Sequence, residues 1–274
     1  MRWARTAAAV ALMCLGIHGP VAAETRYSFA VVPQYGARTL FTIWKPIVDD
    51  VARRTGIALD LVATLDVPHF EKELAAGHFD FVYANPYQVM REAGHQGYRP
   101  LVRDAVPLRG IVVVPKDSPV TKPADLNGLT LAVPSPNAVG ASLLIRSDLE
   151  RLYGARVTLL NAKTHSSVYL HVVNGLADAG GGVEKTFAEQ APSVRDALRV
   201  VYVTRDLPSH PIAAHPRVPK AVQDAVRQAL LDLAASGKGP RLLAAVPMTK
   251  MVPAVIADYR AFDELGLERY WVDE

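Results

Sequence analysis

Cysteine is almost absent from the chain. Its 274 residues include only Cys14, which lies inside an apolar run at residues 7–17. The rest of the chain therefore has no thiol for a disulfide, a thiolate nucleophile or a cysteine-bound metal. The apolar run is too short to cross a bilayer, which takes about 20 residues, and no later run is long enough. The lack of cysteine excludes a protein stabilised by disulfides, and the lack of long apolar runs excludes a polytopic membrane protein.

The first 23 residues have the order of a secretory signal peptide. Arg2 and Arg5 precede the apolar run, and the small residues of 21–23 follow it. We expect cleavage near Ala23; the alternative, an uncleaved anchor, is disfavoured by the short run. Apolar residues continue beyond Cys14, so we expect no lipid attachment there. The sequence predicts a protein that is free in the periplasm.

The chain also lacks a strong charge of either sign. It has 30 Lys and Arg against 27 Asp and Glu, and removal of residues 1–23 deletes Arg2 and Arg5 but no acidic residue. The remaining chain has 28 basic residues and a formal charge of +1. Since nucleic acids and anionic membranes are bound by basic patches, we expect neither as a partner.

Recognisable catalytic motifs are missing as well. The sequence has no G-x-S-x-G, no H-E-x-x-H and no G-x-x-x-x-G-K-[ST] pattern. Its histidines are scattered, without the carboxylate or cysteine neighbours of a metal site. We therefore predict a protein with no catalytic residues, no metal and no other cofactor.

Short strand-like runs alternate with amphipathic helical stretches. In the first part of the chain, strands are predicted at 27–32, 58–63 and 79–84, and helices at 40–54 and 67–76. Two further strands, at 99–103 and 110–115, have no helix between them. A second alternating unit has strands at 129–133, 157–160 and 177–179, with helices at 139–153 and 166–174. This order predicts mostly parallel sheets flanked by helices.

The break in the pattern predicts an α/β protein with two lobes. The strand at 110–115 and another at 199–204 are where we expect the chain to cross between them. We assign residues 24–113 and 205–274 to the first lobe and residues 114–204 to the second. No internal repeat or low-complexity segment is present.

Polar residues follow several of the predicted strands. In open α/β sheets, ligands bind beyond the carboxyl ends of strands. Tyr35 follows the first strand, and Asn85 follows the third, where it could instead serve only as a helix cap. Residues 134–141 lead from a strand into a helix, whose free N–H groups and dipole would suit an anion. The alternative for this segment is an ordinary turn.

Ordered blocks resemble the phosphate, phosphite and phosphonate type of periplasmic solute-binding protein that serves ABC transporters. The blocks are AVVPQ at 30–34, WKPI at 44–47, AGHFDFVYANPY at 76–87, ADLNGLT at 124–130, and the segment from His165 to Gly180. This resemblance implies the type II periplasmic binding protein fold. In that fold two α/β lobes are joined by two crossing strands and close over a ligand by hinge motion.

The resemblance also implies candidate ligand-binding residues in both lobes. Tyr87 is similar to a pocket aromatic of the family, His165 to a ligand-facing histidine, and Glu184 to an acid that meets a ligand's amino group. The family's hydroxyl-rich anion turn corresponds to 135–140, where Asn137, Ala138 and Val139 replace much of the run. The full candidate set is Tyr35, Asn85, Tyr87, Ser135, Asn137, Ala138, Val139, Gly140, His165, Ser167, Glu184, Ser209 and His210.

The resulting prediction is a monomeric binding protein that captures a small anion and delivers it to a permease in the inner membrane. The altered turn leaves the ligand open between a phosphorus oxyanion and another small anion. An alternative is a sensory or accessory protein that presents its ligand state to a receptor kinase or a redox partner.

Overall fold

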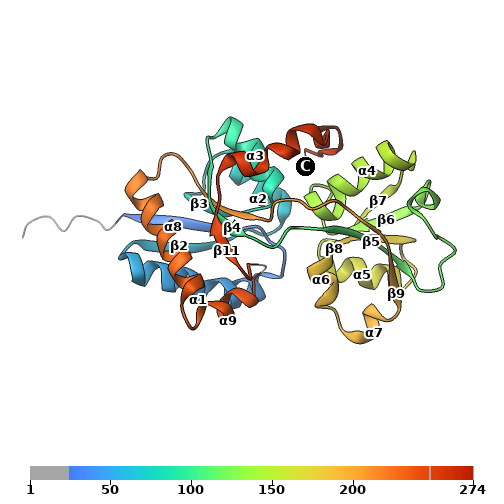
Figure 1. The fold of residues 1–274 in the computed structure, drawn as a ribbon, viewed down its shortest axis with the longest axis horizontal. Coiled ribbons are helices and arrows are strands. Elements are labelled where there is room, and N and C mark those ends of the chain that lie inside the picture. Colours follow the sequence, from blue (N-terminus) through green and yellow to red (C-terminus); the bar gives the residue numbers. More distant parts are fainter. Residues whose placement is uncertain (1–24, 247, 274) are drawn as a thin grey trace, which may run out of the picture.

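The structure is a computed structural model that describes residues 25–246 and 248–273. The predicted signal peptide lies outside the described residues. Two β-sheets with flanking helices form two lobes that lie side by side (Figure 1). No helix in the described ranges is both long and apolar enough to cross a membrane.

The first lobe begins with the expected alternation of strands and helices. The elements are β1 (Arg26–Val31), α1 (Ala37–Thr55), β2 (Ala58–Ala63), α2 (Val67–Ala75), β3 (Phe81–Tyr83) and α3 (Pro86–His95). β1 pairs in parallel with both β2 and β3. α1 is followed by Gly56, whose φ of 69° is the left-handed conformation that favours glycine. α2 is capped by Asp66, whose side chain accepts a hydrogen bond from the N–H of His69 (3.0 Å).

Later segments complete the first sheet with antiparallel pairs. They are β4 (Arg99–Asp104), β10 (Pro211–Ala214) and β11 (Met251–Pro253); α8 (Lys220–Ala235) packs on β4 and β11, and α9 (Gly239–Ala244) packs on α8 and α1. The strand order is β11-β4-β10-β3-β1-β2. The largest apolar core lies around this sheet and includes Phe29, Trp44, Phe70 and Phe81.

The second lobe is a five-stranded sheet in the order β7-β6-β8-β5-β9. Its strands are β5 (Gly110–Pro115), β6 (Thr130–Val133), β7 (Thr158–Asn161), β8 (Ala179–Val183) and β9 (Leu198–Val203). Its helices are η1 (Pro123–Leu126), η2 (Val139–Leu143), α4 (Leu144–Tyr153), α5 (His165–Val173), α6 (Glu184–Ala188) and α7 (Pro192–Arg195). β6, β7 and β8 run parallel, whereas β5 is antiparallel to β8 and β9.

The structure confirms the two-lobed α/β class but moves one boundary. The expected division at 113 falls inside β5, which pairs with β8 and β9 along nearly its whole length and so belongs to the second lobe. The chain crosses between lobes at 105–109 and 204–209 instead. There, Leu108 and Leu207 exchange backbone hydrogen bonds of 2.9 Å. β10 and β11 were not predicted from the sequence.

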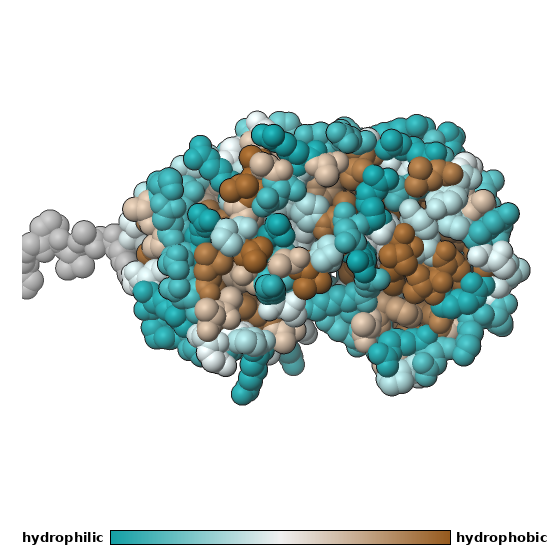
Figure 2. All heavy atoms as spheres, in the orientation of Figure 1, coloured by the Kyte–Doolittle hydropathy of each residue, from teal (hydrophilic) through white to brown (hydrophobic). Residues whose placement is uncertain are grey.

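The C-terminal segment also departs from its expected place in the first lobe. η3 (Ile256–Glu264) packs on α3 of the first lobe, and η4 (Leu267–Tyr270) packs on α4 of the second. Ser147 of α4 donates a hydrogen bond to the carbonyl of Leu265 (2.9 Å). Residues 256–273 therefore lie over both lobes, between α3 and α4 (Figure 1). The space-filling view shows the lobes meeting along a seam that is indented on one side (Figure 2).

Glycines in the second sheet let the backbone of η2 approach unusually closely. A Cβ atom on Gly181 would lie 2.1 Å from the carbonyl oxygen of Ala141, and one on Gly110 would lie 2.0 Å from that of Gly140. No real side chain fits at those separations. The two glycines therefore fix the position of the first turn of the helical stretch 139–153.

We predict that Gly181→Ala lowers the free energy of unfolding by about 1–3 kcal/mol, because the new methyl group must displace the η2 backbone. Urea denaturation measures this. Gly94→Ala is the matched control, because a Cβ atom at this position in α3 would meet nothing within 4 Å. Since alanine is favoured over glycine inside a helix, this variant should raise the free energy of unfolding by about 0.5 kcal/mol. Equal behaviour of the two variants would contradict the close approach.

Candidate functional site

A cavity of about 60 Å³ lies between the two lobes. Residues 32–34 and Asn85 form part of its first-lobe wall, just beyond β1 and β3. Residues 134–135 and Lys163 form part of the opposite wall, just beyond β6 and β7. The cavity thus lies where the carboxyl ends of strands from both sheets meet. Its size suits a ligand of only a few heavy atoms, at roughly 10–15 Å³ for each water-sized group.

The second-lobe wall includes the N-terminal end of the helical stretch 139–153. Residues 138–141 line the cavity. Among the described residues, the backbone N–H groups of Val139, Gly140 and Ala141 have no hydrogen-bond acceptor, whereas those of Ser142 and Leu143 already bond the carbonyl of Ala138. Free N–H groups at the positive end of a helix dipole are suited to an anion.

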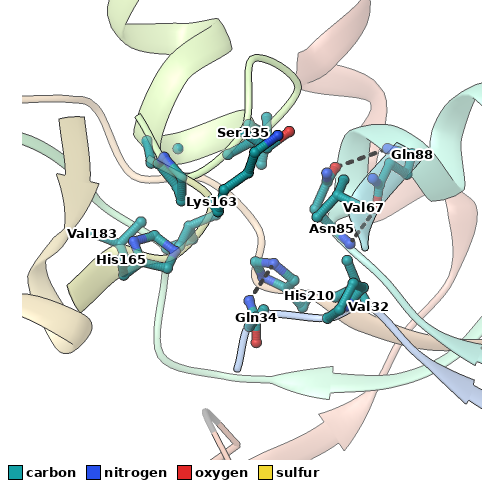
Figure 3. A pocket seen from close by; sticks show the side chains of 17 residues that line it. Val32, Gln34, Val67, Asn85, Gln88, Ser135, Lys163, His165, Val183 and His210 are labelled. Carbon is teal, nitrogen blue, oxygen red and sulfur yellow. Dashed lines mark hydrogen bonds between the residues drawn. The ribbon is translucent and has the colours of Figure 1, made fainter. Parts of the chain in front are cut away.

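Two histidines lie on opposite sides of the cavity. His210 comes from the first-lobe side, where its Nε2 lies 3.2 Å from Nε2 of Gln34 and its ring stacks on Tyr83. His165 begins α5 of the second lobe (Figure 3). Its Nδ1 atom is buried and has no partner in the part of the chain that the structure describes. An unpaired buried nitrogen beside a cavity is suited to a ligand atom.

Burial in the cavity wall changes the protonation of both rings. It lowers the pKa of His165 to about 4. Burial, followed by the nearby His165, lowers the pKa of His210 to about 3. Both imidazoles are therefore neutral at pH 7, and each can donate one hydrogen bond and accept another.

Lys163 supplies the fixed charge of the cavity. Among the described residues lining it, Lys163 is the only lysine or arginine, and none is an aspartate or glutamate. Its φ of 71° is the only positive value for a non-glycine residue in the described ranges. Its N–H bonds Oδ1 of Asn161 (3.1 Å), which helps to hold this conformation. Left-handed backbone at a non-glycine residue is typical of functional sites.

Seven of the thirteen residues proposed from the sequence line this cavity. They are Asn85, Ser135, Ala138, Val139, Gly140, His165 and His210. Three more, Tyr35, Glu184 and Ser209, line an adjoining chamber of about 410 Å³ that shares Gln34, Leu108, Val183 and His210 with the cavity. In that chamber Glu184 lies 3.6 Å from Arg109, and Ser209 donates to the carbonyl of Asp104 (2.7 Å).

The remaining three lie outside the cavity. The hydroxyl of Tyr87 donates to Glu268 (2.8 Å), and its ring packs against Phe262 and Trp271. Ser167 lies in the first turn of α5, where its N–H donates to the hydroxyl of the capping residue Thr164 (3.1 Å). The side chain of Asn137 is directed at other protein groups, described below. Tyr87 stands apart because the C-terminal segment covers it.

The structure adds cavity residues that sequence reasoning missed. Gln34, Gln88, Val67 and Lys163 line it, and Figure 3 shows the last two on opposite sides. Gln34 and Lys163 follow strand ends directly, so the strand-end rule could have found them. Asn85 caps α3 by accepting from the N–H of Gln88 (2.9 Å) and also donates to the carbonyl of Asn137 (3.3 Å).

We predict that stability falls as the pH drops. The unfolded chain binds protons near pH 6.5, whereas His165 and His210 resist protonation until about pH 4 and 3. The stability contributed by the neutral rings is complete above about pH 6.5 and is lost progressively toward pH 4. Urea denaturation between pH 7.5 and 4.5 should show a smaller loss for His165→Gln than for the wild type or for the exposed control His95→Gln. Identical slopes would contradict this.

The sequence profile described as "ABC transporter, phosphonate, periplasmic substrate-binding protein" matches residues 29–259. Solved structures share the fold across nearly all of the chain. A binding protein component of an ABC phosphonate transporter from Pseudomonas aeruginosa is 15% identical, with a TM-score of 0.76 over 90% of this chain and 88% of that one.

Two further structures carry bound molecules. PhnD1 from Prochlorococcus marinus, in complex with methylphosphonate, is 11% identical, with a TM-score of 0.79 over 90% and 99% of the two chains. XAC2383 from Xanthomonas citri, bound to a chloride ion, is 20% identical, with a TM-score of 0.75 over 89% and 98%. These likenesses confirm the type II periplasmic binding protein fold. With a family match across most of its length, the chain belongs to the periplasmic substrate-binding proteins of phosphonate ABC transporters.

Proposed function

We propose that this protein captures a small phosphorus oxyanion between its lobes and delivers it to an ABC permease from the periplasm. The observation that carries the proposal is the set of N–H groups at Val139, Gly140 and Ala141, which have no acceptor among the described residues. They border a cavity whose described wall contains Lys163 but no other lysine, arginine, aspartate or glutamate. Backbone donors and one cation favour an anion. Neutral His165 and His210 add directional donors without a further charge.

The altered turn changes which groups hold the ligand. Ser135 remains, but its hydroxyl already accepts from the N–H of Asn137 (3.2 Å). Ala138 and Val139 offer no side-chain donor. We infer that backbone N–H groups and Lys163 replace the hydroxyl groups that the family typically places here. The methylphosphonate bound to the Prochlorococcus protein supports a phosphorus ligand for this fold.

The absence of a carboxylate from the described cavity wall points to a ligand without an ammonium group. A buried ammonium needs a charged or strongly polar acceptor. Glu184, the candidate acid, faces the adjoining chamber and lies near Arg109. We therefore propose that phosphite or a short alkylphosphonate is preferred to an aminoalkylphosphonate.

We predict that methylphosphonate and phosphite raise the melting temperature of protein first unfolded and refolded to remove retained ligand. Calorimetric titration should give 2-aminoethylphosphonate at least tenfold weaker affinity than methylphosphonate, because the described cavity wall has no carboxylate to pair with the ammonium. Acetate and sulfate test whether other anions bind. Tighter binding of the amine, or no binding of any phosphorus oxyanion, would contradict the proposal.

Replacement of Lys163 should separate binding from stability. Lys163→Ala removes the charge and should weaken methylphosphonate binding roughly fivefold, with less dependence on salt. Lys163→Gly also relieves the left-handed backbone and should raise the free energy of unfolding by about 1 kcal/mol. Titration and urea denaturation measure the two effects, with the exposed Lys72→Ala as control. Wild-type affinity in both Lys163 variants would remove this residue from the site.

A further inference from the structure

Asn137 joins the second lobe to the first immediately beside the cavity. It directly precedes the wall at 138–141, and only 2% of its surface is exposed. Its side-chain Nδ2 donates to Oε2 of Glu71 in α2 (2.8 Å) and to the carbonyl of Val272 (2.8 Å). Its Oδ1 accepts from the N–H of Val272 (3.0 Å). Both amide hydrogens are therefore used by protein groups, which leaves neither for a ligand.

The pairing with Val272 is reciprocal. The side-chain amide of Asn137 and the backbone of Val272 each donate to the other, as two residues of an antiparallel strand pair do. This fixes the plane of the amide. The second hydrogen of Nδ2 is then directed at Glu71.

The partners of Asn137 are themselves held in place. Glu71 accepts a hydrogen bond from Nε2 of Gln88 (2.6 Å), and Gln88 lines the cavity. Trp271, next to Val272, lies with its ring centre 4.2 Å from the guanidinium carbon of Arg91 in α3. Arg146 of α4 donates to the carbonyl of Tyr270 (2.6 Å). The end of the chain is therefore fixed to helices of both lobes.

We propose that Glu71, Asn137 and Val272 form a closure latch that holds the lobes together over the ligand, with Asn137 as a positioning residue. Glu71 belongs to the first lobe and Asn137 to the second, so separation of the lobes must break their hydrogen bond. The latch and the ligand stabilise the same closed state, and the latch therefore strengthens apparent affinity and slows ligand release. This inference rests on the proposed function, since it requires a ligand between the lobes.

Asn137→Ala tests the latch directly, with methylphosphonate as the probe. Loss of the hydrogen bond to Glu71, together with the two that orient the amide on Val272, should weaken affinity about 10- to 100-fold, mainly through faster dissociation in stopped-flow measurements. Asn174→Ala is the matched control, because Asn174 is exposed and outside the cavity. Dissociation at the wild-type rate in Asn137→Ala would overturn the proposal.

Val272→Pro removes the backbone N–H that donates to Asn137. Because residue 272 is near the end of the chain, we expect this variant to fold. It should speed dissociation in the same direction by a smaller factor. The double variant Asn137→Ala with Val272→Pro should be no weaker than Asn137→Ala alone, because both changes break one pairing. Fully additive effects would show that Val272 acts independently and would overturn its place in the latch.

A measurement without ligand separates failure of the latch from failure of the proposed function. Spin labels on Thr39→Cys and Ser193→Cys, both exposed and in different lobes, report the distance between the lobes. Asn137→Ala should shift this distance to longer values, and Asn174→Ala should not. Unchanged distances would overturn the latch even if methylphosphonate binds, and a shift would support it even if no phosphorus oxyanion binds.

Discussion

The contact of η2 with the glycines of β5 and β8 is the constraint on which the rest of the site depends. Only residues without a Cβ let the backbone oxygens of Gly140 and Ala141 lie this close to the sheet. That contact fixes the start of the stretch 139–153, so that three N–H groups border the cavity without acceptors in the described residues. A few side chains of the opposite lobe then complete the enclosure.

The cavity wall contains few charged groups. One lysine and the end of a helix dipole supply the positive potential, and two histidines are kept neutral by burial. A site of this kind attracts an anion without the cost of several buried charges. The left-handed backbone of Lys163 lowers the stability of the fold, and it occurs at a residue that lines the cavity.

Much of the fold was accessible from the sequence because hydrophobic periodicity is a local property. The strands at 58–63 and 110–115 were placed to the residue. The short strands β10 and β11 were missed, because their pairing depends on distant partners. In the site, His165 and the turn after β6 were found from the family resemblance and the strand-end rule.

Other features depend on tertiary contacts that no local pattern encodes. Tyr87 and Asn137 were proposed as ligand residues, yet residues 268–272 of the C-terminal segment contact both of them. Nothing in the local sequence predicts the left-handed backbone of Lys163. The lobe boundary moved because β5 pairs with strands on both sides.

The most direct test of this account is a crystal structure of the ligand-depleted protein soaked with methylphosphonate. We expect a phosphonate whose oxygens lie about 3 Å from the backbone nitrogens of Val139, Gly140 and Ala141, with Lys163 beside it. A phosphonate held in the adjoining chamber, without contact to these nitrogens, would contradict it.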